Sequence, residues 1–259
     1  MAEALITIKP LAVAFLGGIL PALVWLWFWH RQDRDCPEPR GLVILSFMAG
    51  MVVVFFVAPL QKLVHVSMPQ IMDLFAQLTQ GSAHANISMT SVERFLWAGI
   101  EEVAKYGVIL FVALRSYSYS EPIDAIIYMI TGALGFAAME NTLYLLKDMV
   151  ASGTLDIILN GNMRFIGATL VHTVSSAFVG VAVAMAFYAS RFLQKIAALI
   201  GLIGAALLHA YFNLSIMDVT GTLNVLQVFS KFWIVIIVLI ILIQIVKRVA
   251  RPTDTCPIQ

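Results

Sequence analysis

The stretch FLWAGIEEVAKYGVILFVAL (residues 95–114) places charged side chains inside an otherwise apolar helical pattern. It is long enough to cross a bilayer, which takes about 20 mostly apolar residues. Glu101, Glu102 and Lys105 nevertheless lie near its centre. Ionisable groups inside membrane helices are costly and usually mark functional sites. The stretch therefore predicts a membrane protein with a buried polar site.

The composition of the whole chain also indicates a membrane protein. Of its 259 residues, 61% are hydrophobic and 12% are charged, and the mean hydropathy is +0.91. A soluble globular domain is about half apolar and about a quarter charged. The formal net charge is only +1, so no basic field indicates nucleic acid as a partner.

Seven segments are long and apolar enough to span a bilayer, so we expect an all-α, polytopic helix bundle forming one transmembrane domain over residues 1–259. These segments are 10–29, 41–60, 91–114, 122–147, 163–188, 196–217 and 230–247. Lys and Arg are concentrated in the first link and the C-terminal tail. Positive charge favours the cytoplasmic side, which predicts the N-terminus outside and the C-terminus inside.

The one long connection on the predicted outer side covers residues 61–90. Within it, apolar residues recur with the spacing of one helix face: Ile71, Leu74, Phe75 and Leu78. We therefore expect a separate amphipathic helix over residues 68–80, lying on the outer membrane interface.

Four ionisable side chains from four successive spans share one depth. They are Glu101, Glu140, His172 and His209. At about 1.5 Å per residue, all four are expected roughly 10–15 Å below the outer surface. Scattered structural polar residues would not need to share a level. We therefore expect these side chains to meet in one cavity of a four-helix core over residues 91–217.

Two imidazoles and a carboxylate can hold Zn²⁺ and leave a position for water. One prediction takes Glu140, His172 and His209 as the metal ligands, with Glu101 as the general base. Asn213, one helical turn after His209, would then donate a hydrogen bond to the developing oxyanion. In this scheme Lys105 balances the charge of the glutamate pair, and Glu102 braces the site with Lys105 or Arg164.

Four motifs follow one another in these spans. EEVAK (101–105) matches EExxK, FAAMEN (136–141) matches FxxxEN, His172 stands in the next span, and HAYFN (209–213) matches HxxxN. Together they resemble the PrsW family of intramembrane proteases, related to the CAAX-processing and bacteriocin-processing group. The resemblance covers about residues 91–217. It implies a catalytic set of Glu101, Glu102, Lys105, Glu140, Asn141, His172, His209 and Asn213.

The resemblance implies a multi-pass endopeptidase of the bacterial cytoplasmic membrane. Its substrate would be a single-span membrane protein, such as an anti-sigma factor, cut near the extracytoplasmic side of the lipid bilayer. The wider group has FxxxH where this chain has Phe136 and Glu140. A second mechanism therefore stays open, in which no metal is bound, Glu101 is the base, and His209 with Asn213 forms the oxyanion site.

Two other classes of function also use buried histidine or glutamate. His172 and His209 could be the axial ligands of a haem in an electron carrier. Buried acids and histidines also form relays in proton-coupled transporters. The haem alternative leaves Glu101 and Glu140 unexplained at the same depth.

Overall fold

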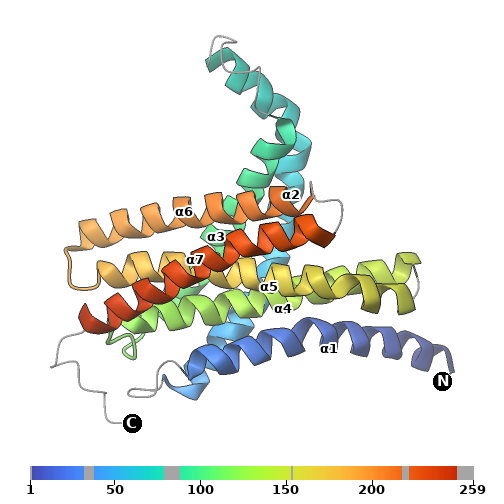
Figure 1. The fold of residues 1–259 in the computed structure, drawn as a ribbon, viewed down its shortest axis with the longest axis horizontal. Coiled ribbons are helices and arrows are strands. Elements are labelled where there is room, and N and C mark those ends of the chain that lie inside the picture. The colour runs from blue at the N-terminus through green and yellow to red at the C-terminus, as the bar shows by residue number, and fades with distance from the viewer. Residues whose placement is uncertain (1, 32–37, 79–87, 153, 218–221, 250–259) are drawn as a thin grey trace.

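The computed structural model describes residues 2–31, 38–78, 88–152, 154–217 and 222–249, all of which lie in helices or short links. The helices are α1 (Ala2–His30), α2 (Arg40–Leu78), α3 (Met89–Val112), α4 (Pro122–Ser152), α5 (Thr154–Met185), α6 (Arg191–Met217) and α7 (Thr222–Val249). The predicted all-helical architecture with seven helices is therefore confirmed (Figure 1).

Within the described ranges, six helices carry segments apolar and long enough to cross a membrane: Leu11–Trp29, Arg40–Leu74, Pro122–Lys147, Gly167–Met185, Arg191–Ser215 and Ser230–Arg248. The exception is α3, whose sequence carries Glu93, Arg94, Glu101, Glu102 and Lys105. The protein is thus a multi-pass membrane protein with six candidate spans. The predicted crossing by residues 91–114 and the orientation of the chain stay predictions.

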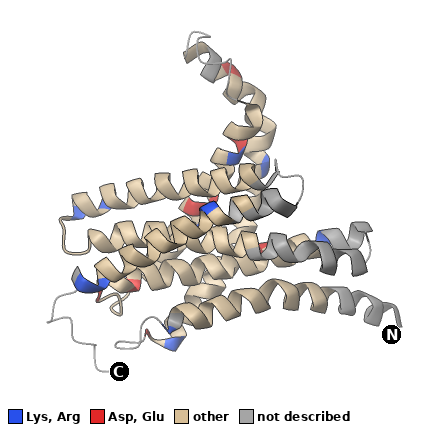
Figure 2. Ribbon diagram, in the orientation of Figure 1, with Lys and Arg blue, Asp and Glu red and all other residues tan. Residues whose placement is uncertain are grey.

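The helix α4 lies at the centre of the bundle and packs against α1, α2 and α5, while α6 packs against α3 and α5. In Figure 1, α2 and α3 cross the other helices and project beyond them as a hairpin. Most of the ribbon in Figure 2 belongs to uncharged residues, and many large apolar side chains of the described helices are exposed. The bundle therefore presents an apolar exterior to lipid and keeps a few charged groups inside.

The helix α2 runs without interruption from Arg40 to Leu78, through Pro59 and Pro69. The prediction of a separate amphipathic helix over 68–80 is therefore wrong in one respect, because residues 68–78 are the last part of α2 and 79–80 lie outside the described ranges. Membrane helices tolerate internal proline because neighbouring groups satisfy the freed backbone carbonyls. The location of residues 68–78 at the membrane interface stays a prediction.

Glycines allow α2 and α4 to approach at backbone distance. A Cβ atom added to Gly135 would overlap the carbonyl oxygen of Phe47, and one added to Gly50 would overlap that of Gly132. Small residues permit this kind of close packing between membrane helices. The position of α2, and of every side chain that α2 presents to α3, therefore depends on these glycines.

Replacing Gly135 by Ala is expected to lower the free energy of unfolding by about 1–3 kcal/mol, because the added methyl group overpacks the α2–α4 contact. Thermal unfolding in detergent measures this as a lower Tm. Gly107→Ala is the matched control, since nothing lies within 4 Å of a Cβ at Gly107. Equal melting temperatures for the two variants would contradict this account of the packing.

Candidate active site

Four helices deliver ionisable side chains to one buried cluster. The cluster consists of Glu101, Glu102 and Lys105 from α3, Glu140 from α4, His172 from α5 and His209 from α6. All except Glu140 are almost completely buried. The side chain of Glu140 is 40% exposed, so this residue gives the cluster its contact with the surroundings.

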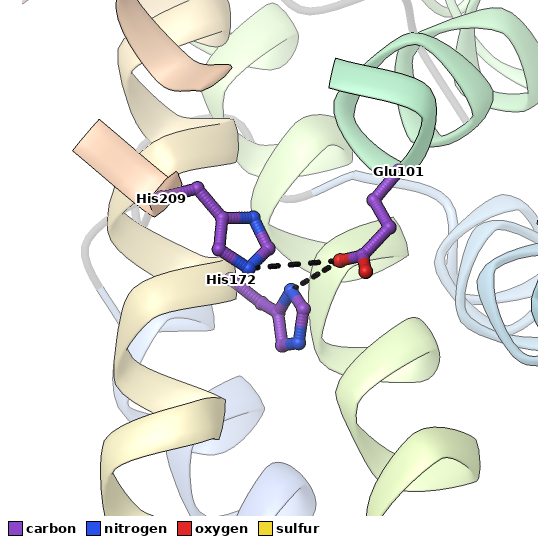
Figure 3. Close-up of side chains that lie close together, drawn as sticks. All are labelled: Glu101, His172 and His209. Carbon is purple, nitrogen blue, oxygen red and sulfur yellow. Dashed lines mark ion pairs between the residues drawn. The ribbon is translucent and has the colours of Figure 1, made fainter. Parts of the chain in front are cut away.

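Glu101 and the two histidines form the centre of the cluster (Figure 3). Oε2 of Glu101 lies 3.8 Å from Nδ1 of His172 and 3.6 Å from Nε2 of His209. This oxygen is buried and accepts no hydrogen bond from any residue that the structure describes. Since buried carboxylate oxygens normally have a partner, the unpartnered atom indicates a place for a ligand between the three side chains.

Glu102 fixes the protonation of His209. Nδ1 of His209 lies 2.9 Å from Oε1 of Glu102, so the imidazole donates its Nδ1 proton to the carboxylate. The lone pair of Nε2 is then left facing Glu101. A carboxylate behind a histidine in this way is the usual support of a metal-binding imidazole.

Glu102 itself has partners on both oxygens. Nζ of Lys105 donates to Oε1 over 2.6 Å, and Oγ of Ser176 donates to Oε2 over 3.0 Å. Lys105 is thus one of the contacts of Glu102, and it is one of the two partners expected from the sequence. The bracing role of Glu102 stays a prediction. The side chain of Arg164, the other expected partner, lies outside the described residues.

His172 is held from both ring nitrogens. Nε2 lies 2.8 Å from Oε2 of Glu140 and donates to it, while Nδ1 lies 3.0 Å from Nζ of Lys105 and accepts from it. The rings of Phe136 and His209 pack against the imidazole at 5.1 Å and 4.8 Å between centroids. The lone pair on Nδ1 of His172, which faces Glu101, therefore accepts a hydrogen bond from the Lys105 ammonium.

The structure arranges the predicted residues differently from the proposed metal set. It groups Glu101, rather than Glu140, with the two imidazoles, and it places Glu140 behind His172. Asn141 donates to Oγ1 of Thr169 over 3.2 Å and so links α4 to α5. Asn213 is half-buried, and no hydrogen bond joins it to the cluster among the described side chains. The catalytic roles of Asn141 and Asn213 stay predictions.

Two further polar residues touch the cluster and were not among the site residues predicted from the sequence. Nε2 of Gln61 donates to Oε1 of Glu101 over 2.6 Å, and Ser176 contacts Glu102 as described. Gln61 could have been found as a carboxamide two residues after Pro59 in an apolar helix. Ser176 could have been found one helical turn after His172.

The residues of the centre fit a divalent metal. Ligand atoms bound tetrahedrally at about 2.0–2.2 Å lie about 3.3–3.6 Å apart, close to the two distances measured from Oε2 of Glu101. Two imidazoles and one carboxylate are also a common donor set for zinc in hydrolases. The surrounding cluster contains three carboxylates and one ammonium, so a divalent cation would balance its charge.

Comparison with known proteins relates the chain, including the residues of the cluster, to one family. The model of a family described as PrsW family intramembrane metalloprotease matches residues 38–243. Protease PrsW of Geobacillus kaustophilus (strain HTA426) is 28% identical over 135 residues, which are 52% of this chain and 52% of the relative. Protease PrsW of Halalkalibacterium halodurans is 28% identical over 175 residues, 68% of this chain and 67% of the relative. Protease PrsW of Bacillus subtilis (strain 168) is 28% identical over 131 residues, 50% of this chain and 52% of the relative.

The chain thus spans about half to two thirds of the length of these relatives. No solved structure matches it. The family match covers well over half of the chain and includes every residue of the cluster, so the resemblance read from the four motifs is confirmed. The chain belongs to the PrsW family of intramembrane metalloproteases.

Proposed function

We propose that this protein is an intramembrane metalloprotease that hydrolyses a peptide bond of a membrane-anchored protein. The observation that carries the proposal is the buried group of Glu101, His172 and His209, in which one carboxylate oxygen has no hydrogen-bond partner among the described residues. Family membership supports the same activity.

In this proposal Glu101, His172 and His209 hold the metal, and zinc is the ion that their donor atoms suit best. A bound divalent metal would polarise the scissile carbonyl and make water a stronger acid. Glu102 keeps the Nδ1 proton on His209, which leaves Nε2 free as a ligand. Lys105 contacts Glu102 as well as His172, so it would still have a partner if the lone pair of His172 were used by a metal.

Glu140 is the best candidate for the general base. Glu102 is occupied by three donors, and Glu101 is assigned to the metal. Glu140 is the partly exposed carboxylate of the cluster, and the hydrogen bond to His172 uses only its Oε2. It can therefore accept a proton from the attacking water and later deliver it to the leaving amine. This exchanges the roles that the sequence alone suggested for Glu101 and Glu140.

The substrate proposed here is a single-span membrane protein of the anti-sigma-factor kind. Supporting this choice, the depth pattern of the sequence puts the four ionisable residues roughly 10–15 Å below the outer surface. Cleavage would then take place near the extracytoplasmic side of the bacterial cytoplasmic membrane. The haem alternative is disfavoured, because the rings of His172 and His209 are in edge-to-face contact and axial ligands require a porphyrin between them.

The test is cleavage in liposomes that contain the purified protein and a set of single-span reporters with varied juxtamembrane sequences. We expect fragments, identified by mass spectrometry, that disappear after treatment with 1,10-phenanthroline and return when Zn²⁺ is added. The Asp73→Asn variant, changed at an exposed carboxylate of α2, should cleave like the unchanged protein. Full cleavage by protein shown to be free of metal would instead support the metal-free mechanism. Failure of the zinc-loaded protein to cut any reporter would count against the protease.

A further inference from the structure

We infer that Gln61 is a positioning residue that orients Glu101 for metal binding, an inference that rests on the metal site proposed above. Gln61 belongs to α2, which is not one of the four helices that supply the cluster. Its Nε2 donates to Oε1 of Glu101 over 2.6 Å, which is a short hydrogen bond for a carboxamide and a carboxylate.

The contact determines which oxygen of Glu101 faces the histidines. The terminal torsion of a glutamate is broad, so the carboxylate can rotate unless a partner holds it. Gln61 holds Oε1, and Oε2 is left buried beside the two imidazoles, with no hydrogen-bond donor from the described part of the chain. Without Gln61 both oxygens would lack a protein donor, and the orientation that serves the metal would no longer be favoured.

With Gln61 included, each side chain of the centre has its own supporting partner. Glu102 supports His209, Glu140 supports His172, and Gln61 supports Glu101. The type of partner also suits each ligand, because histidines need an acceptor and a carboxylate needs a donor. A neutral carboxamide donor orients Glu101 and leaves its negative charge available to the cation.

The fold holds Gln61 in place through the apolar face that precedes it. Val54, Val57 and Gln61 are spaced as i, i+3 and i+7 and so share one face of α2. Val54 and Val57 are buried in a cluster with Phe136 of α4, and Ile100 of α3 packs against that cluster. This packing fixes the rotation of α2 and aims the next residue of the face, Gln61, at Glu101.

The test measures zinc affinity by competition with a chromogenic chelator, which does not depend on catalysis. Gln61→Met removes the donor at nearly constant size, and we expect zinc to bind about 10–100-fold more weakly, as for other partners of metal ligands. Gln194→Met is the matched control. Gln194 is also a half-buried carboxamide, but it donates to the carbonyl oxygens of Phe187 and Ala189 at 2.9 and 3.2 Å. It should lose stability and keep the zinc affinity of the unchanged protein.

A double-mutant cycle separates positioning from general damage. In a Glu101→Gln background, where the imidazoles hold zinc more weakly, adding Gln61→Met should change the affinity no further. If Gln61→Met does not fold, Gln61→Asn replaces it, since the shorter amide cannot reach Glu101 and the same loss is expected. An affinity within twofold of the unchanged protein, or an equal loss in both backgrounds, would overturn the inference. Absence of zinc binding by the unchanged protein would instead overturn the proposed metal site.

Discussion

Replacement of Glu101 by Gln should reduce peptide hydrolysis by at least about 10³-fold and weaken zinc binding by more than the roughly 10–100-fold that outer partners contribute. The carboxamide keeps the size of the side chain but removes the charge and the free oxygen that face His172 and His209. Turnover of a cleaved reporter and the zinc content of the purified variant measure the two effects. Asp73→Asn supplies the matched change at an exposed carboxylate.

The variant Glu140→Gln distinguishes the two ways of assigning the metal-ligand and general-base roles to Glu101 and Glu140. If Glu140 is the general base, this variant should weaken zinc binding by no more than the roughly 10–100-fold of a supporting partner, because the new carboxamide still lies beside His172. With zinc in excess, so that the site is loaded, it should lose about 10²–10⁴-fold in turnover. If Glu140 is a ligand, as the sequence suggested, this variant should lose the metal and Glu101→Gln should retain it. The second pattern would refute the assignment drawn from the geometry.

Lys105→Met should be the most destabilising single substitution in the cluster. The ammonium is fully buried, contacts Glu102 at 2.6 Å and lies 4.8 Å from the ring centre of Phe136. Removing one partner of a buried ion pair typically costs about 3–5 kcal/mol, because the remaining charge is left uncompensated. Thermal unfolding in detergent should show a Tm lower by on the order of 10 °C.

Two variants check the physical reason for this loss. Lys195→Met, at an exposed lysine of α6, should melt like the unchanged protein. Combining Lys105→Met with Glu102→Gln removes both charges. The double variant should therefore lose less free energy of unfolding than the two single variants lose in sum. Strict additivity would show that Lys105 does not act through Glu102.

The sequence predicted the membrane bundle and the helices that meet at the site, because both follow from hydrophobic length and depth. Residues such as Glu101 and His209 stand out when nearly everything around them is apolar. The same reasoning could not extend to α2, because the predicted span ended at residue 60 and the structure shows a helix that continues to Leu78. Gln61 was missed for this reason, since it was assigned to a loop.

The sequence also could not predict which of the two glutamates of α3 pairs with Lys105. Lys105 stands three residues from Glu102 and four from Glu101, and both spacings bring side chains together on a helix. The choice between them depends on neighbours from other helices. Ser176 and His209 donate to Glu102, and Gln61 donates to Glu101, so each glutamate acquires a different environment. Such contacts become visible only once α2, α5 and α6 are placed beside α3.

The central claim is that Glu101, His172 and His209 together bind one catalytic metal ion. X-ray absorption at the zinc edge of the zinc-loaded protein tests it most directly, because the spectrum reports the kind and distance of the bound atoms. The account predicts two imidazole nitrogens at about 2.0–2.1 Å and oxygen ligands at about 2.0–2.2 Å, with one imidazole lost in His209→Ala. A spectrum without imidazole, or one that His209→Ala leaves unchanged, would contradict it.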